Sequence, residues 1–262
     1  MIAYSKSPLI IGHRGASSVA PENTIAAFAR AFADRADGIE FDVRLARDGV
    51  PVVIHNSSLR HTGRRNGKVA RLSSGKLGQT DVGSSFNARH PRFAQPSYAQ
   101  ESIPTLDHVL ALLDTQTRPD FIAYVELKTV RLGASNAQLA ATVVELVKRR
   151  NFQDRVIVIS FNLQVVALVR RLAPSIRTGA LIGPRQRATR SAQRIIAATL
   201  ACGADEILLH HHLAKRRILE LARAANLTPV VWTIDDPKWL ARARNSGIHA
   251  LMTNNPAKMR AG

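Results

Sequence analysis

Short apolar runs alternate along the chain with segments of helical period. Apolar runs of about four to eight residues indicate buried strands, and apolar residues three and four positions apart indicate helices. Eight strands with helices between them predict an α/β protein with a (β/α)8 or TIM barrel; a doubly wound open sheet is the alternative. The predicted strands are Leu9–Gly12, Gly38–Val43, Phe121–Leu127, Val156–Ser160, Ile176–Leu181, Glu206–Leu209, Pro229–Trp232 and Ala250–Met252, and the predicted helices are Thr24–Ala36, Leu106–Leu113, Ala134–Arg150, Leu163–Leu172, Ser191–Cys202, Ala214–Ala225 and Pro237–Asn245.

The regular spacing breaks once, after the short strand-like run VPVVIHN at 50–56. Residues 56–102 are rich in Ser, Gly, Asn and Arg, and they include eight Lys and Arg against two acids. Their apolar content is too low for an independent core, and long loops of this kind usually carry function. We therefore expect a single barrel domain over residues 1–262, with 56–102 as a basic insertion over the barrel mouth.

The segment GIEFDVRL at 38–45 alternates apolar and charged residues. Glu40 and Asp42 are two positions apart, so in a strand their side chains leave from the same face. A barrel sheet is covered on both faces, and burying ionised carboxylates without partners is costly. A hard divalent cation, Mg²⁺ or Ca²⁺, would neutralise them, and salt bridges to Arg44 and Lys128 are the alternative.

The same pattern recurs in YVELKTV at 124–130, where Glu126 and Lys128 share one face of a predicted strand. Both acidic segments lie near the C-terminal ends of their strands, where barrel enzymes hold their active sites. Glu126 is therefore predicted to join Glu40 and Asp42 in a three-carboxylate site for one divalent cation.

Two histidines also follow strand-like runs. His13 and Arg14 come directly after the first strand in LIIGHRGAS, and His55 ends the run VPVVIH. A lone histidine is more often structural than catalytic. Two of them, beside a metal site and an arginine suited to bidentate phosphate contact, suggest acid–base chemistry on a phosphate ester.

Other common chemical motifs are missing. There is no G-x-G-x-x-G, no P-loop and no G-x-S-x-G, and Cys202 has no metal-ligand companion. The run His210–His212 could bind a transition metal, but it is internal and adjacent to a strand. A surface or loop tract is the favoured interpretation.

Composition adds a strong positive charge: 37 Lys and Arg against 19 Asp and Glu give a net charge of +18. This favours anionic partners, including an anionic lipid surface, although a basic solvated surface explains it equally well. Aromatic residues make up 5% of the chain, and none interleaves with a basic stretch, which argues against nucleic acid. With one cysteine, no apolar run of membrane-spanning length and no leader before the first strand, we expect a cytoplasmic protein.

The segments GHRGASSVAPENTIAAF, GIEFDVRLARDGVPVVIHN and VELK together resemble the glycerophosphodiester phosphodiesterase family. The resemblance is dense from Leu9 to His55 and continues sparsely through NGKVARLSSGKL, IPTLDHVL, ISFN and VVWTIDD. The combination of HRG, PENT, E-x-D and the following histidine is far more specific than any one element. The resemblance implies a (β/α)8 barrel with an insertion after the second strand region, which the stretch 56–102 matches.

The resemblance also implies roles for eight residues. Glu40, Asp42 and Glu126 would be ligands of one divalent metal, usually Mg²⁺ or Ca²⁺; His13 and His55 would be the general acid–base pair; Arg14 and Lys128 would bind the phosphodiester; and Trp232 would line the glycerol or leaving-group side. The implied reaction is metal-dependent hydrolysis of a small glycerophosphodiester to sn-glycerol 3-phosphate and an alcohol, with water or the substrate's own hydroxyl as nucleophile. In PENT, Asn23 or Thr24 is expected to cap the first helix, without a catalytic role.

The sequence departs from the family pattern in two places. The family commonly has T-D-x-P after the last strand, but this chain reads TNNPA, with Asn254 at the aspartate position, so specificity could differ. Asn255 and Pro256 still indicate a helix start. Lys76 stands where the family often has an acid, which would favour an anionic leaving group or surface.

Two other functions stay open on these patterns. One is a phospholipase D-type member of the same superfamily that acts on lysophospholipids or sphingolipids. The other is a non-enzymatic barrel that binds polyanions through the insertion. The sequence carries no signal for an oligomeric state.

Overall fold

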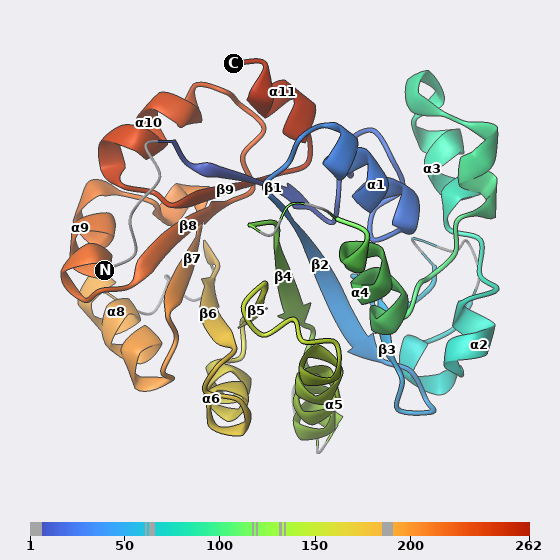
Figure 1. The fold of residues 1–262 in the computed structure, drawn as a ribbon, viewed down its shortest axis with the longest axis horizontal. Helices are drawn as coiled ribbons and strands as arrows, with labels where there is room; N and C mark the ends of the chain where they lie inside the picture. The colour runs from blue at the N-terminus through green and yellow to red at the C-terminus, as the bar shows by residue number, and fades with distance from the viewer. Residues whose placement is uncertain are drawn as a thin grey trace.

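The computed structural model describes residues 7–60, 62, 66–116, 118, 120–130, 133, 135–184 and 191–262. Eight parallel strands form a closed barrel, in which the last strand pairs with the first (Figure 1). The strands are β1 (Leu9–His13), β2 (Gly38–Leu45), β4 (Ile122–Leu127), β5 (Val156–Ser160), β6 (Arg177–Ile182), β7 (Glu206–His210), β8 (Thr228–Trp232) and β9 (Ala250–Thr253). The (β/α)8 barrel is confirmed, and the open sheet is wrong because closure between β9 and β1 leaves no free edge in the barrel.

The run VPVVIHN supplies an extra strand outside the barrel sequence. This strand, β3 (Pro51–Val53), is antiparallel to the end of β2, with Val53 opposite Val43. The backbone N–H of Ile54 then donates to the carbonyl of Asp42 at 2.9 Å. The hairpin therefore folds back along β2 and returns His55 to the level of the β2 carboxylates.

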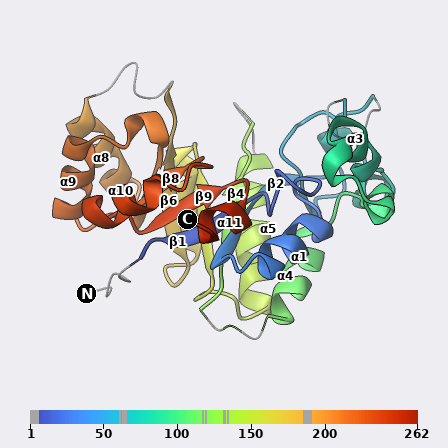
Figure 2. The same ribbon diagram turned by 90° about the horizontal axis from the view of Figure 1, so that it is seen from above.

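The helices surround the barrel and cover its outer face (Figures 1 and 2). Two predicted starts, Thr24 and Ser191, are N-caps whose hydroxyls accept hydrogen bonds from the backbone of Ala27 and Arg194. The predicted helix residue Ala134 lies outside the described residues. The helices are α1 (Ile25–Ala33), α4 (Leu106–Asp114), α5 (Ser135–Arg149), α6 (Leu163–Leu172), α8 (Ala192–Ala201), α9 (Arg216–Ala224), α10 (Trp239–Ser246) and α11 (Pro256–Arg260).

Apolar side chains pack on both faces of the barrel wall. Ile39, Phe41 and Val43 of β2 belong to an outer cluster with residues of the surrounding helices, such as Phe28 and Leu110. A smaller cluster fills the interior with side chains of the other strands, including Ile11, Tyr124 and Leu208. Because strand side chains alternate, the outward direction of Ile39 and Phe41 sends Glu40 and Asp42 inward, as predicted.

The insertion contains short helices and packs against the barrel. Leu59 and Leu77 share an apolar cluster with Ile54, while Phe86 and Tyr98 cluster with Ala27 of α1. Figure 2 shows α3 on the side of the barrel away from α8 and α9. The elements are η1 (Val69–Arg71), α2 (Ser74–Leu77), α3 (Gly83–Arg89), η2 (Pro91–Phe93) and η3 (Pro96–Gln100). Within the described part of the chain, the helices are too short or too polar to traverse a bilayer.

A buried carboxyl lies at the N-terminal ends of the strands, away from the residues discussed above. Glu206 begins β7, is 1% exposed and accepts a hydrogen bond from the Tyr124 hydroxyl at 2.9 Å. Arg177, which begins β6, lies 3.5 Å from the other carboxyl oxygen. Burial raises the pKa of Glu206 to about 7, although Arg177 and Tyr124 both act to lower it. The surroundings of Glu206 at the N-terminal ends of the strands therefore favour its protonated form.

This raised pKa predicts a pH-dependent stability. Because the folded-state pKa lies above the ordinary value of 4.5, the contribution of Glu206 is fully present below about pH 4.5 and is lost as the pH rises through about 7. Relative to Glu206→Gln, the wild-type protein should lose roughly 3 kcal/mol in its free energy of unfolding across this window. Guanidinium denaturation at several pH values measures it. The exposed Glu220→Gln is the control, and an unchanged pH dependence in Glu206→Gln would contradict the prediction.

Candidate active site

The turn after β1 holds His13 and Arg14 against β2. Arg14 has a left-handed backbone, with φ 55°, and Gly15 follows with φ 79°. A Cβ atom on Gly15 would lie 2.6 Å from backbone atoms of Ala27, so glycine is required there. The turn directs the backbone N–H of Arg14 at the carboxylate of Glu40, which accepts it at 3.1 Å.

The three predicted acidic residues lie together on neighbouring strands. Asp42 of β2 is directly opposite Glu126 of β4, and Glu40 lies on the same inner face of β2. One carboxylate oxygen of each residue lies within 4.8 Å of the other two, and all three side chains are buried. The strand register alone therefore assembles the acidic cluster.

Cations from two loops compensate Asp42. The Lys128 ammonium lies 3.0 Å from Oδ1 of Asp42 and 2.6 Å from Oε1 of Glu126. Nε of Arg14 lies 3.2 Å from Oδ2 of Asp42, and the Asn23 amide donates to the same oxygen at 2.8 Å. Burial acts to raise the pKa of Asp42, but Lys128 and Arg14 outweigh it and lower that pKa well below its usual range.

The other two carboxylates are not fully compensated. Burial, followed by the charge of Asp42, raises the pKa of Glu126 to about 7 and raises that of Glu40 well above its ordinary value. Arg14 also pairs with Glu22, at 2.8 Å. Among the described residues, the three carboxylates of the cluster thus face only two cations, and Arg14 is shared with Glu22, which leaves the cluster short of positive charge.

The donor set fits one divalent cation. Oδ1 of Asp42 is buried and accepts no hydrogen bond within the described part of the chain; its close contact is the Lys128 ammonium. Carboxylate oxygens alone form the cluster, and such a set suits Mg²⁺ or Ca²⁺ better than softer metals.

A chain of hydrogen bonds orients His13. Its Nδ1 lies 2.7 Å from Oδ1 of Asn254, which also accepts from the Ser17 hydroxyl at 3.0 Å. The side-chain and backbone N–H groups of Asn254 donate to Asp235 at 2.8 and 2.7 Å. Because Asp235 fixes the Asn254 amide, its oxygen must face His13, so Nδ1 of His13 carries the proton. Its Nε2 is 3.8 Å from Glu40. Burial, followed by Arg14, lowers the pKa of His13 to about 4.

The backbone carbonyl of His55 is held by Arg44, near the end of β2. The Arg44 guanidinium donates to the His55 carbonyl from Nε at 2.9 Å and from its terminal nitrogen at 2.7 Å. Of the two cations in the salt-bridge alternative, Lys128 pairs with the acidic cluster, whereas Arg44 forms no salt bridge among the described residues. Arg44 lies near the outer end of β2, where the β3 hairpin brings this carbonyl to it. Burial lowers the pKa of the His55 imidazole, although Asp42 opposes this.

Seven of the eight predicted site residues line one cavity of about 250 Å³, and the eighth, Asp42, contacts two of them. The Trp232 indole packs edge-to-face against Phe161, with ring centroids 5.6 Å apart, and its N–H donates to the Leu208 carbonyl. One wall of the cavity is therefore charged and the other apolar. The residues that line it are His13, Arg14, Glu40, His55, Glu126, Lys128, Ile159, Phe161, Leu181, Trp232 and Met252.

Sequence reasoning missed several residues that support this cavity. Of the two cap candidates in PENT, Thr24 caps α1. Asn23 has a left-handed backbone, with φ 59°, and its amide donates a hydrogen bond to Asp42. Asp235 and Phe161 were not singled out, although both lie in the stretches VVWTIDD and ISFN that carried the family resemblance. Their partners lie far along the chain, so the sequence held no sign of the contacts.

The cavity lies at the C-terminal ends of the barrel strands, where (β/α)8 enzymes hold their active sites. It brings an acidic cluster, two histidines and two cationic side chains together, and this combination is typical of an enzyme that acts on phosphate esters. Comparisons with known proteins agree. Residues 13–258 match the model of the glycerophosphoryl diester phosphodiesterase family. The chain belongs to this family and is a phosphoric diester hydrolase.

Individual relatives cover nearly the whole chain. A glycerophosphodiester phosphodiesterase of Caldanaerobacter subterraneus is 30% identical over 256 residues, which are 95% of this chain and 94% of that protein. A solved phosphodiesterase of Oleispira antarctica, in complex with the product sn-glycerol-3-phosphate, is 25% identical with a TM-score of 0.81 and covers 97% of this chain and 96% of its own. A glycerophosphodiester phosphodiesterase structure from Agrobacterium tumefaciens is 27% identical, with a TM-score of 0.77 and coverage of 97% and 100%.

The ion pairs of Lys128 predict a large effect on stability. Lys128→Met leaves two buried carboxylates without their ammonium partner, and such a loss costs about 3–5 kcal/mol in free energy of unfolding. Urea denaturation in the presence of a chelator measures this cost. The exposed Lys76→Met should change the same quantity by less than about 0.5 kcal/mol. Equal effects from the two substitutions would show that Lys128 does not compensate the cluster.

Proposed function

We propose that the chain hydrolyses glycerophosphodiesters to sn-glycerol 3-phosphate and an alcohol, with the help of one divalent cation, Mg²⁺ or Ca²⁺. The observation that carries this proposal is the close approach of three buried carboxylates beside two cations and two histidines in one cavity. The product complex of the Oleispira relative supports this substrate class. The cytoplasmic location and the contact with an anionic lipid surface stay predictions of the sequence.

Charge accounts for how the substrate would be held. Glu40, Asp42 and Glu126 would hold the cation, which when bound neutralises phosphate oxygens and lowers the pKa of the attacking hydroxyl or water. Arg14 and Lys128 would bind the phosphodiester, because both line the cavity beside the carboxylates. A monoanionic diester and three carboxylates are balanced by these two side chains and one divalent ion. Glu22 lies outside this balance and keeps Arg14 in place.

Two histidines would move the protons. His13 keeps its proton on Nδ1 through Asn254, so its Nε2 is the available acceptor and would take the proton of the nucleophile. His55, in its protonated form, would give its proton to the leaving alcohol and end neutral. The apolar wall formed by Trp232 and Phe161 would face the glycerol or the leaving group, where it would exclude water.

A panel of phosphodiesters tests the proposed reaction. We expect release of sn-glycerol 3-phosphate from glycerophosphocholine, loss of this release with a chelator, and its return when Mg²⁺ or Ca²⁺ is added. Glu40→Gln should lose the metal-dependent activity, whereas the exposed Glu145→Gln should keep it. Full activity of Glu40→Gln in the presence of a chelator would end the metal proposal. A cyclic phosphate formed from lysophosphatidylcholine would identify the phospholipase D-type reaction instead.

The hydrogen bond from Asn254 predicts a selective loss of turnover. Asn254→Ala frees the His13 ring, and a misplaced catalytic group costs up to about 10²-fold, so kcat should fall toward that extent while KM changes little. His13→Ala should cost roughly 10²–10⁴-fold, and adding Asn254→Ala to it should cost no more.

The neighbouring Asn255 gives a matched control for this loss. Asn255 caps α11 and has no contact with His13 among the described interactions, so Asn255→Ala should lower stability by about 1 kcal/mol and leave kcat unchanged. Nitrogen-15 NMR of the imidazole reports the tautomer directly. If the His13 signals of Asn254→Ala match those of the wild-type protein, Asn254 does not position the ring.

A further inference from the structure

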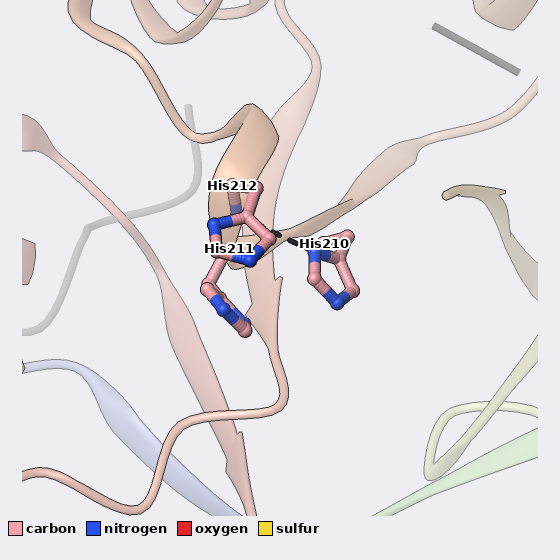
Figure 3. A group of neighbouring side chains, drawn as sticks. All are labelled: His210, His211 and His212. Carbon is pink, nitrogen blue, oxygen red and sulfur yellow. Dashed lines mark hydrogen bonds between the residues drawn. The ribbon is translucent and has the colours of Figure 1, made fainter. Parts of the chain in front are cut away.

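Three consecutive histidines gather beside the apolar wall of the cavity. His210 ends β7, and His211 and His212 begin η4 (His211–Leu213). Figure 3 shows their rings close together. The ring centroids of His211 lie 4.2 Å from those of both neighbours, and those of His210 and His212 are 5.1 Å apart.

The backbone explains why these rings converge. Consecutive side chains of a 3₁₀-helix point about 120° apart, so three of them would not normally meet. Here His210 keeps an extended backbone, with φ −57° and ψ 139°, and the chain turns into η4 directly after it. The turn folds the His210 ring back over the first two residues of the helix. One nitrogen of each ring then lies within 4.8 Å of one nitrogen of the other two.

Nδ1 of His210 and Nδ1 of His211 make few contacts with other polar groups of the protein. Nδ1 of His211 is buried and has no hydrogen-bond partner among the residues that the structure describes. Nδ1 of His210 accepts only a long contact, 3.4 Å from the backbone N–H of His212. A neutral imidazole binds a metal ion through the ring nitrogen that carries no proton.

We propose that His210, His211 and His212 form a second metal site, which binds a late transition-metal ion such as Ni²⁺, Cu²⁺ or Zn²⁺. Imidazole nitrogen suits these ions, whereas Mg²⁺ and Ca²⁺ require the oxygen ligands found in the acidic cluster. The two sites therefore select different metals. Three protein ligands leave a coordination position for water or another small ligand. The sequence favoured a surface or loop tract, because the run is internal and adjacent to a strand. The convergence of the rings depends on the turn at His210 and is visible only in the structure.

The two tryptophans of the chain report on this site. The Trp232 ring lies 5.0 Å from that of His210, and the Trp239 ring lies 6.5 Å from that of His211. Bound Ni²⁺ or Cu²⁺ quenches nearby indole fluorescence. Trp232 also lines the catalytic cavity, so Trp232→Phe is the background of choice: it leaves Trp239, which does not line that cavity, as the single reporter.

The test is a titration of the full chain, without a histidine tag and in excess Mg²⁺, with Ni²⁺. We expect saturable quenching of Trp239 at one ion per chain, reversal by a chelator and competition by Zn²⁺. Substituting both His211 and His212 by Ala should weaken binding at least about tenfold, while His108→Ala, at an exposed histidine on α4, should not.

A second measurement does not depend on tryptophan or on the double variant. The single change His212→Ala affects an exposed side chain, so its folding can be verified by its thermal midpoint. The electron paramagnetic resonance spectrum of bound Cu²⁺ should show nitrogen couplings that decrease in number in this variant. Identical Ni²⁺ affinity in the wild type and both variants, or Cu²⁺ couplings unchanged by His212→Ala, would overturn the proposal. Phosphodiesterase activity with Mg²⁺ is a separate readout, so neither result bears on the proposed reaction.

Discussion

The compensation of buried negative charge is the constraint on which the barrel mouth depends. The register of β2 and β4 places Asp42 opposite Glu126, and three buried carboxylates then lie close together. Unpaired charges there would destabilise the fold by several kcal/mol. Two cationic side chains at the barrel mouth partly neutralise these charges: the turn after β1 supplies Arg14, and the end of β4 supplies Lys128. The negative charge that remains uncompensated is the basis of the proposed divalent-cation site.

The barrel separates chemistry from stability along its axis. At the C-terminal ends of the strands, polar groups converge on a cavity with one charged and one apolar wall. At the opposite end, Glu206 is protonated easily and is closed off by Tyr124 and Arg177. Trp232 lies between the cavity and the histidine cluster, because its ring contacts both Phe161 and His210. An ion on the histidine cluster would therefore lie directly behind the wall of the substrate cavity.

Most of the fold could be predicted from the sequence, since each predicted strand is present with ends shifted by at most two residues. The inward direction of Glu40 and Asp42 followed from the two-residue period of a strand. The contact partners of individual side chains could not be predicted from the sequence. Arg44, which the salt-bridge alternative pairs with a carboxylate, binds the His55 carbonyl, because the β3 hairpin brings that group to it. Of the two cap candidates, Thr24 caps α1, whereas Asn23 holds Asp42.

The sequence by itself determined which residues alternate, which faces are buried and which chemical groups are available, because these depend on local periodicity and composition. The tertiary structure decided which groups meet. His13 and Asn254 are 241 positions apart and touch because β1 pairs with β9 to close the barrel. The three histidines were visible as a run, but their convergence depends on one backbone turn at His210. Contacts of this kind depend on strand register and loop conformation, which no local pattern encodes.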